Sequence, residues 1–568
     1  MNLLSKEKGS LSSYENMNDL IGACVRFHHK CRCKRDNSDV HHNRIELSRC
    51  ILRFHEESGT LTDGVQQSIE KLQDSSCVLL MAAHQPNLFA YSGVLRKGAL
   101  GQVLENRLSG ILDTPVVMLF GIADQDFCDD RWVRSAQLPD VERRAGSLTL
   151  GLGIPKTRAL LNKVMLPKGT LDGWRKEIEQ WLHSKFNSIR DMSRSLGIEI
   201  GVDSDLIFGN FEDFWLTVRD AYTKARTYSD FNAFLMSMIT NAIWGYHTLF
   251  ARFSECQQIL SKEFCFLLSH FQEYSQRLRE AESGVCARDC DKSEHDFIPF
   301  WYHCDCGSKA RLKAKQEGQS LLGEGQCLGC GRTHRIDFCT MDTPSVSTIM
   351  ERISARAISM PLVFFPGLGV CGYIGGVGGK EYLRKAQYVA RSLGIEFPPV
   401  AIWRPRDVYL GLAQLEAMMT YRRLTGTFDL SQHPTAVAQL TEKISASRKQ
   451  VEDLQSLGKT IPANDEMNEK ERNQQVNWIS ARKRKTIRET GLPLMIRKLN
   501  LLKNVAIIKD QYPCIVDYAV NIGLRSTSEQ WITHLKKGGD FSSSVRLETG
   551  LDKAIQAAMP ELHKKWEN

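Results

Sequence analysis

Four cysteines near the middle of the chain are spaced like metal ligands. They form two close pairs separated by a polar segment: Cys304 with Cys306, and Cys327 with Cys330. Two thiolate pairs on tight turns can complete a tetrahedral Zn²⁺ site, and Gly307 and Gly331 suit such turns. The first pair is Cys-x-Cys instead of the commoner Cys-x-x-Cys, so His303 or His334 could replace one thiolate. The pattern predicts a zinc ribbon with a closed, structural metal site that has no open position for activating water.

Two polar motifs follow apolar runs in the part of the chain before the ribbon. Residues 77–83 and 115–122 are predicted strands, and a helix is predicted between them at 93–106. Buried strands that alternate with helices favour a parallel sheet, which places its reactive loops at the carboxyl ends of its strands. The candidate active-site residues in and after these loops are His84, Gln85, Asn87, Lys97, Asp124, Gln125 and Asp126.

The side chains in these loops suit proton transfer and ligand binding. His84 can donate or accept a proton near neutral pH, and Gln85 and Asn87 can hold a substrate or a phosphate through neutral hydrogen bonds. Asp124 and Asp126 could orient a hydroxyl or an amine, accept a proton, or bind Mg²⁺ beside a nucleotide. The alternative is that the two carboxylates only cap the element that follows.

A glycine-rich stretch after the ribbon could hold an anion. It lies between a predicted strand at 362–365 and a predicted helix at 381–393, and its candidate binding residues are Gly375, Gly376 and Gly378. Glycine lets backbone amides approach a ligand closely, and a helix start favours negative charge. The stretch is not a Walker A loop, because Ile374 stands where the leading Gly belongs and Glu381 replaces the required Ser or Thr.

Two arginines follow the next predicted strand, residues 400–403. Arg404 and Arg406 come directly after its apolar residues. Because a guanidinium binds carboxylates and phosphates with two parallel hydrogen bonds, either arginine could clamp an anionic group of the substrate.

The order of these elements predicts six segments in a chain of 568 residues, which is longer than one core usually supports. We expect an N-terminal extension (1–60), the first half of the sheet domain (61–168), a helical insertion (169–296), the ribbon (297–340), the second half of the sheet domain (341–430), and a coiled-coil arm with a closing segment (431–568). In the arm, apolar residues recur at steps of three and four between Val437 and Leu454, as in a coiled-coil seam. The basic run 482–485 on the same arm is either a solvated face or a polyphosphate or nucleic-acid contact.

Composition predicts a soluble protein of the cytoplasm. The seventeen cysteines are spread along the chain without the density of a disulfide scaffold, which suggests a reducing compartment. The first residues carry no apolar signal segment, and polar residues interrupt the longest apolar stretch, so no membrane partner is expected. A net charge of +8 is modest for this length and permits an anionic partner without requiring one.

Taken together and in order, several of these segments resemble the bacillithiol-biosynthesis cysteine-adding enzyme family (BshC). The resemblance covers residues 77–535 apart from the ribbon. It rests on Ala83–Phe89 with Lys97, on Ile122–Phe127, on Tyr373–Gly378 and Gly394–Pro399, on the coiled-coil arm, and on Tyr512–Leu535.

The resemblance implies a Rossmann-like nucleotidylyltransferase core of the HUP type, an arm that forms a homodimer, and an amide bond between cysteine and a glucosaminyl malate acceptor. This chain departs from the family pattern at three positions: His84 stands where the family tends to have Gln, Gln125 where it tends to have His, and Val377 where it tends to have Pro. An exchange of His between two facing loops could keep one imidazole in the site. The ribbon has no counterpart in typical members, so the acceptor could differ as well.

The sequence therefore predicts a ligase that forms a carbon–nitrogen bond, adding cysteine or another amino acid to a small acceptor. ATP or another nucleotide would activate the carboxylate, with Mg²⁺ as an accompanying ion. In the alternative hypothesis the chain is an RNA-associated enzyme of the same fold class, and the ribbon residues Lys309, Arg311, Lys313 and Lys315 face a phosphate backbone. The absence of a KMSKS-like loop disfavours that nucleic-acid partner. A third hypothesis makes the chain a non-catalytic scaffold.

Overall fold

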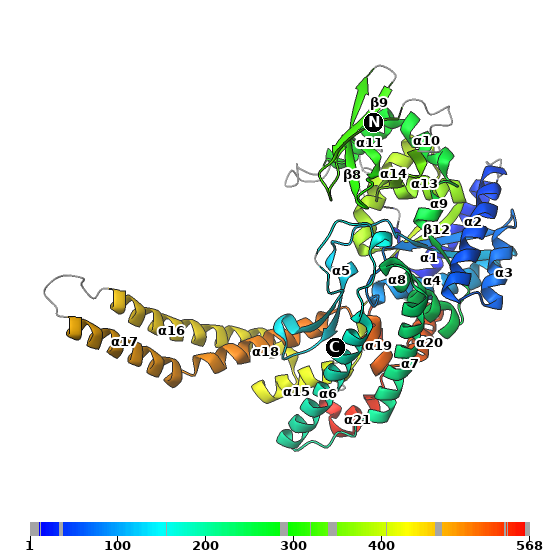
Figure 1. Ribbon diagram of the computed structural model, residues 1–568. Helices are drawn as coiled ribbons and strands as arrows, with labels where there is room; N and C mark the ends of the chain where they lie inside the picture. Colours follow the sequence, from blue (N-terminus) through cyan, green and yellow to red (C-terminus); the bar gives the residue numbers. More distant parts are fainter. Residues whose placement is uncertain are drawn as a thin grey trace, which may run out of the picture.

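A six-stranded parallel sheet forms the centre of the computed structural model (Figure 1). The structure describes residues 11, 13–32, 38–154, 156–283, 293–317, 320–338, 349–404, 406–459, 469–538, 541 and 543–562. The strand order is β1-β13-β12-β2-β3-β6, and every neighbouring pair is parallel. The strands are β1 (Ser13–Tyr14), β2 (Val78–His84), β3 (Val116–Ile122), β6 (Leu249–Arg252), β12 (Val370–Gly376) and β13 (Val400–Trp403). The predicted parallel-sheet α/β architecture is confirmed.

Alternate residues of the strands face two separate layers of helices. Leu80 and Met118 pack on one face with the apolar side of α4 (Ser92–Leu112). Leu79 and Val117 pack on the opposite face with α14 (Lys380–Ser392). Both faces of the sheet are therefore covered by helices and shielded from water, which is why the central strands are continuous apolar runs. The remaining helices against the sheet are α1 (Met17–Arg32), α2 (Ser38–Ser58), α3 (Asp63–Leu72) and α13 (Ser359–Leu368).

Connections leave the two central strands in opposite directions. From β2 the chain runs through α4 to β3, whereas from β12 it runs through α14 to β13. Because α4 and α14 lie on opposite faces, β2 and β12 are neighbours at which the strand order reverses. Open α/β sheets bind ligands in the crevice outside the carboxyl ends of such strands. The fold thus marks the edge that carries the loops after β2 and β12.

One predicted strand is a helix. Residues 362–365 are not a strand but part of the buried helix α13, and the strand is β12, which already contains Gly375 and Gly376. A short apolar run between turn residues does not distinguish a buried helix from a buried strand. The predicted helical insertion, 169–296, also contributes strand β6, which pairs with β3.

One hairpin and helices of different lengths lie beside the sheet. The hairpin consists of β4 (Ser135–Pro139) and β5 (Ser147–Gly151). The helices are α5 (Arg131–Arg134), α6 (Thr170–Leu196), α7 (Ser204–Lys224), α8 (Tyr228–Ser237), α9 (Phe253–Cys256), α10 (Ser261–Ser269) and α11 (Phe271–Ser283). Trp174, Ile178, Trp181 and Leu182 of α6 are buried in the main core. Their spacing of three and four residues forms the apolar stripe of an amphipathic helix.

The ribbon is a five-stranded antiparallel sheet over the carboxyl edge of the central one. Its strands occur in the order β10-β9-β8-β7-β11. Their bounds are β7 (Phe297–His303), β8 (Lys309–Glu317), β9 (Ser320–Gln326), β10 (Thr333–Asp337) and β11 (Ile353–Ala355). In Figure 1 this sheet lies at the top, above α13 and α14.

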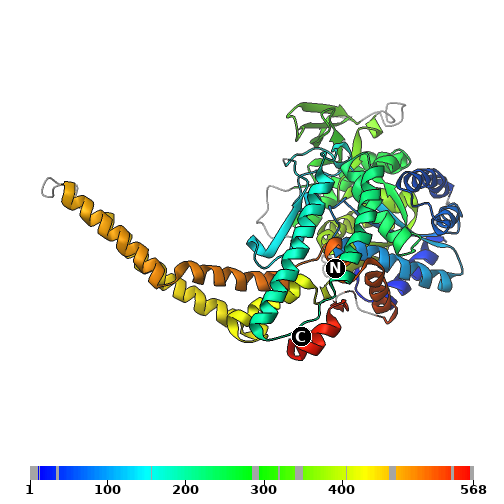
Figure 2. The same cartoon turned by 60° about the horizontal axis from the view of Figure 1, so that its bottom comes forward.

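Helices α16 (His433–Lys459) and α17 (Glu469–Glu489) form an antiparallel arm whose tip points away from the body (Figures 1 and 2). Ile444 and Val451 of α16 meet Leu492 in a small separate core. Gly491, with a φ of 62°, ends one helix and allows the next to begin. The other elements of this part are α15 (Leu412–Thr425), α18 (Leu492–Asp510), α19 (Ile515–Asn521), α20 (Leu524–Lys536), α21 (Asp552–Ala558), β14 (Asp407–Val408) and β15 (Val545–Arg546). Among the described residues, none of the helices combines the length and apolarity needed to cross a bilayer.

Candidate active site

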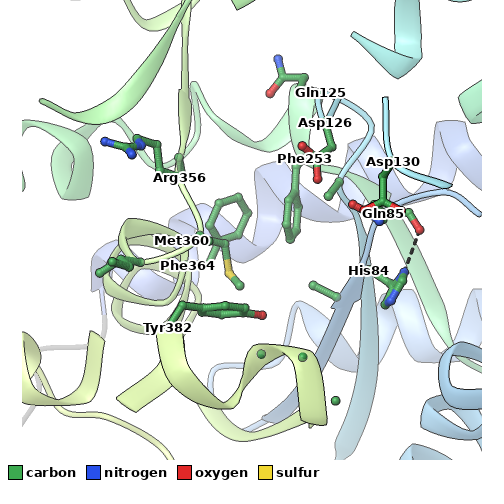
Figure 3. Close-up of a pocket in the computed structure, with 18 of the residues that line it drawn as sticks. His84, Gln85, Gln125, Asp126, Asp130, Phe253, Arg356, Met360, Phe364 and Tyr382 are labelled. Carbon is green, nitrogen blue, oxygen red and sulfur yellow. Dashed lines mark hydrogen bonds between the residues drawn. The ribbon is translucent and has the colours of Figure 1, made fainter. Parts of the chain in front are cut away.

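A cavity of about 980 Å³ opens at the carboxyl edge of the sheet, between the loops after β2, β3 and β12 and the ribbon (Figure 3). Of the twelve candidate catalytic and binding residues, seven line it: His84, Gln85, Lys97, Gln125, Asp126, Gly376 and Gly378. The five that do not line it are Asn87, Asp124, Gly375, Arg404 and Arg406. Segments from both halves of the sheet domain therefore meet in one crevice.

His84, the last residue of β2, presents a neutral imidazole. Its Nδ1 lies 2.8 Å from the carbonyl oxygen of Gln85, which can only accept, so Nδ1 carries the proton (Figure 3). The Nε2 atom is left as an acceptor and lies 3.5 Å from the hydroxyl of Tyr91. Desolvation, and then the nearby charge of Lys97, lower the pKa of His84 to about 3. At neutral pH the ring is therefore uncharged, with an N–H group at Nδ1 and an acceptor atom at Nε2.

Lys97, on the first turns of α4, is the group beside His84 that titrates near neutrality. Its ammonium is buried and donates a hydrogen bond of 2.8 Å to the carbonyl of Ala83. Burial lowers the pKa of Lys97 to about 7. An amine with this pKa can take up or release a proton at physiological pH.

The two acids of the second loop have different surroundings. Asp126 is half-exposed and faces the cavity, with the Nζ of Lys309 3.6 Å from its Oδ1. Asp124 is buried outside the cavity, where its carboxylate accepts hydrogen bonds from the backbone and hydroxyl of Ser254 and from the amide of Asn162. Burial raises the pKa of Asp124, and these hydrogen bonds partly oppose the increase. Asp124 ties the loop to α9 and does not line the cavity, unlike Asp126.

Asn87 also fixes the backbone and does not contact the cavity. Its amide donates to the carbonyl of Trp132 at 2.8 Å, and the side chain is buried. Two residues later Phe89 has a φ of 45°, an unusual value for a non-glycine residue, and its ring is buried against Trp174. The loop after β2 is thus held in a costly backbone conformation by packing beneath it.

The turn after β12 exposes backbone amides to the cavity. Gly376 ends the strand, residues 377–379 form one 3₁₀ turn, and α14 starts without a side-chain cap. A Cβ placed at Gly376 or Gly378 would meet nothing within 4 Å, whereas one at Gly375 would lie 3.1 Å from Leu383. Gly375 is therefore packed beneath the helix, and its two neighbours border open space.

A second helix also starts at the cavity without a side-chain cap. This helix is α4, which follows Tyr91, and its first residues include Gly93 in the cavity wall. The N–H groups of Ser92 and Val94 donate to the carbonyls of Pro513 and Tyr91, so Gly93 is the first-turn residue of α4 whose amide remains for a ligand among the described residues. Such N–H groups at helix starts favour bound anions such as phosphate or carboxylate.

The arginines expected to clamp an anion lie elsewhere. Arg404 is exposed, and Arg406 is exposed and paired with Asp510 at 3.2 Å. Trp403, the last residue of their strand β13, lines the cavity, but the two arginines after it do not. The basic residues that line the cavity besides Lys97 are Lys309, Arg356 and Lys385.

One wall of the cavity is apolar. The rings of Phe253 and Phe364 lie with centroids 4.4 Å apart, and Met360 and Tyr382 continue the surface (Figure 3). A Cβ at Gly121 would lie 2.1 Å from Phe253, so a glycine in β3 is required to admit this ring. No local sequence pattern indicates this wall, because its residues come from three separate helices, α9, α13 and α14. A flat ring of a ligand would suit such a surface.

The four cysteines converge as metal ligands. Their Sγ atoms all lie within 4.8 Å of one another, with Cys304 to Cys330 at 3.7 Å and Cys306 to Cys327 at 3.4 Å. Sulfur atoms in a tetrahedral Zn²⁺ site are about 3.8 Å apart, given Zn–S bonds of about 2.3 Å. The cluster fits a metal ion, as predicted.

Neither alternative histidine ligand belongs to this cluster. His303 Nε2 is 2.8 Å from the hydroxyl of Ser354, and the ring of His334 packs on Tyr302 with centroids 4.9 Å apart. Among the described residues, these four cysteines are the one group of three or more His, Cys, Asp or Glu side chains close enough together to share a metal ion.

The ribbon is fastened directly to the active-site loops. The backbone N–H of Leu160 donates to Gly307 at 2.9 Å, and the hydroxyl of Ser308 donates to the carbonyl of Arg158 at 2.6 Å. The next residue, Lys309, donates to the carbonyl of Gln125 at 2.8 Å. The metal site and the cavity are thus connected through one short segment.

Comparisons with known proteins leave the family open. No family model matches the chain, and no curated protein matches it. A solved structure from Campylobacter jejuni, assigned provisionally as an arginyl-tRNA synthetase, is similar over 80% of this chain and 92% of its own length, at 10% sequence identity and a TM-score of 0.20. A likeness this weak identifies neither a fold family nor a function, and none of these findings supports the resemblance to the cysteine-adding enzymes.

Proposed function

We propose that this chain is a ligase that forms a carbon–nitrogen bond between an amino acid and a small acceptor, with activation by a nucleotide. The proposal depends on one observation: a neutral imidazole, an amine that titrates near neutrality, a carboxylate and two uncapped helix starts border one cavity at the reversal of strand order. The resemblance to the cysteine-adding family gives the reaction type, and the nucleotidylyltransferase-like core is part of the same proposal.

Different parts of the cavity lining suit the two parts of a nucleotide. The starts of α4 and α14 favour the phosphates, and the wall around Phe253 and Phe364 suits the base. Asp126 and Asp130 also line the cavity and would hold a Mg²⁺ ion brought by the nucleotide. A volume of about 980 Å³ leaves room for an amino acid beside it.

Bond formation requires a neutral amine near an activated acyl group. In the adenylylating form, the substrate carboxylate displaces pyrophosphate from ATP, the amine then attacks the acyl carbon, and the bond from that carbon to AMP breaks. We assign the proton lost by the amine to Lys97, because its pKa of about 7 suits transfer at neutral pH. His84 would orient the amine through Nε2.

The deciding experiment incubates the purified protein with ATP labelled at the α- or the γ-phosphate and a panel of amino acids and acceptors. We expect AMP or ADP release that depends on one particular amino acid, and the identity of the nucleotide product separates adenylylation from phosphorylation. The Lys97→Met variant should lose this release, whereas Lys443→Met, on the arm, should retain it. Nucleotide release that is independent of every amino acid, or absent, would contradict the proposal.

The nucleic-acid alternative loses part of its basis in the ribbon. Lys309 is buried on Gln125, and Arg311 pairs with Glu294 at 3.4 Å. Lys315 is exposed but pairs with Glu317 at 2.6 Å. The basic residues of β8 therefore do not form a continuous exposed surface. A salt titration of tRNA binding tests what remains, because a phosphate-backbone contact must weaken steeply as salt rises.

A further inference from the structure

Lys309 belongs to the ribbon and yet forms part of the cavity wall. It starts β8, its side chain is only 3% exposed, and its ammonium reaches the loop after β3. There it donates one hydrogen bond of 2.8 Å to the carbonyl oxygen of Gln125. The carboxylate of Asp126, at 3.6 Å, is an ion-pair partner beyond normal hydrogen-bond length.

The ammonium lies against two aromatic rings. Its Nζ atom is 4.5 Å from the ring centroid of Phe127 and 4.9 Å from that of Trp301, and the two rings are packed edge to face. Ring faces attract a cation, but they accept no strong hydrogen bond. An ammonium has three N–H donors, and within the described part of the chain one of them has a hydrogen-bond partner. A buried cation on a cavity wall is left with donors for a ligand.

The acids beside Lys309 are shared with other groups. Glu294 pairs with both Arg356 and Arg311, and Asp126 is half-exposed at the cavity. Neither acid lies within hydrogen-bond distance of the Lys309 ammonium. A ligand with a negatively charged oxygen would accept the remaining N–H groups of Lys309.

The two cysteine turns hold the backbone of Lys309 from both sides. In the first turn, the N–H of Cys304 donates to Ser308, the residue before the lysine, at 2.9 Å. From the second turn, the N–H of Leu328 donates to the carbonyl of Lys309 itself at 3.1 Å. A metal bound by all four cysteines would fix both turns, and its loss would free the segment that places the ammonium.

We propose that Lys309 binds an oxyanion of the substrate, a carboxylate or a phosphate, and that metal binding by the four cysteines holds this lysine in the cavity. This inference rests on the proposed function for the identity of the cavity as an active site. It gives the metal a positioning role in ligand binding at a distance from the reacting atoms.

The test of the lysine is calorimetric titration of the full-length, metal-loaded protein with four probes: ATP, pyrophosphate, L-cysteine and L-aspartate. In Lys309→Met the stem between Phe127 and Trp301 is retained and the charge is lost, and we expect at least one probe to bind about tenfold more weakly or worse. The matched control, Lys313→Met, changes an exposed lysine on the same strand and should bind every probe like the native protein. Weakening confined to ATP and pyrophosphate identifies a phosphate, and weakening confined to the amino acids identifies a carboxylate. If no probe binds more weakly to Lys309→Met than to the native protein, the proposal is overturned.

The test of the metal is a double comparison. Native protein and Lys309→Met are each titrated before and after metal removal, and a Cys306→Ser variant repeats the comparison without a chelator. We expect metal removal to weaken probe binding by the native protein to the level measured for Lys309→Met. In Lys309→Met itself, metal removal should weaken probe binding little further. If metal removal weakens probe binding by the same factor in the native protein and in Lys309→Met, the metal does not act through Lys309. Amino-acid-dependent nucleotide release with unchanged probe affinity would overturn this inference and leave the proposed ligase activity standing.

Discussion

Basic side chains have opposite surroundings in the body of the molecule and in its arm. In the body, Lys185 and Lys309 are buried and point at specific oxygen atoms. On the arm, Arg482 and Arg484 are exposed, and Lys485 pairs loosely with Glu489 at 3.6 Å across the helix surface. The residue types are the same, but a second layer of structure covers the first group and none covers the second. Burial decides whether such a charge stabilises the fold, serves a site or is only solvated.

The largest difference in stability between the two regions is expected when one lysine is replaced in each. The Nζ of Lys185 lies 2.6 Å from Glu416 and 2.8 Å from Asp140, and all three side chains are buried. Lys185→Met leaves two buried acids without their cation, which should cost about 3–5 kcal/mol of unfolding free energy. The matched arm variant, Lys485→Met, should leave the thermal unfolding midpoint unchanged. Similar unfolding midpoints for the two variants would show that burial does not decide how much a lysine contributes to stability.

Variants of His84 measure how much a neutral side chain in the body contributes to turnover. Because its pKa is near 3, the ring acts through hydrogen bonds, and a glutamine amide can replace it in part. We expect His84→Ala to lower turnover about 100-fold and His84→Gln to lower it less than about tenfold. His42→Gln, at an exposed position, is the control. Equal losses in the Ala and Gln variants would indicate proton transfer by the imidazole.

A buried histidine away from the site should give the body a pH dependence. Burial lowers the pKa of His55 to about 3, and its Nε2 accepts a hydrogen bond of 3.0 Å from the N–H of Phe250. The unfolded chain, with a histidine pKa of about 6.5, binds the proton first, so stability present above that pH is lost as the pH falls toward 3. The contribution is about 1.4 kcal/mol per pH unit at most. Unfolding of the native protein and of His55→Gln, measured from pH 7 to 5, should differ in slope, and equal slopes would exclude His55 as the cause.

The glycine turn allows ligand binding to be changed with little effect on folding. A methyl group at Gly378 would enter open space in the cavity, whereas one at Gly101 would lie 2.7 Å from Met118. Gly378→Ala should therefore keep the native unfolding midpoint and weaken nucleotide binding about tenfold. Gly101→Ala, as the converse control, should lower the midpoint. Unchanged nucleotide affinity in Gly378→Ala would place the phosphates elsewhere.

The smallest effect is expected on the arm. Replacing Arg482, Lys483, Arg484 and Lys485 together by glutamine should leave turnover within about twofold of the native value, because exposed charges contribute little. Binding of tRNA by the same variant provides the sharper comparison. A lower salt dependence than in the native protein would show that these side chains contact phosphates and would support the nucleic-acid alternative.

The parts of the fold that depend on local pattern could be predicted from the sequence. The strands before His84 and Ala123 are uninterrupted apolar runs, and their carboxyl ends must share one edge in a parallel sheet. The cysteine spacing similarly places four thiols on two facing turns. In both cases a short stretch of chain carries the signal.

The rest required knowledge of what packs across the loops. Asp124 and Asp126 look equivalent in sequence, but Ser254, which comes from a distant helix, binds the carboxylate of Asp124. Lys309 looks like one of several ribbon lysines until the ribbon lies against Gln125. Only tertiary contacts separate a ligand-facing charge from a structural or solvated one.

The pairing of β1 with β13 has a consequence for how the chain is made. Ser13 lies opposite Val400, so this strand pair can form only after the long segment between the two residues has been translated. Strands β2, β3 and β6 can associate earlier, whereas the edge of β2 stays open until β12 emerges. Sheets closed by such distant pairings fold slowly and expose unpaired edges to aggregation. Expression at reduced translation temperature, or with chaperones that shield nascent strands, should therefore raise the yield of the native protein.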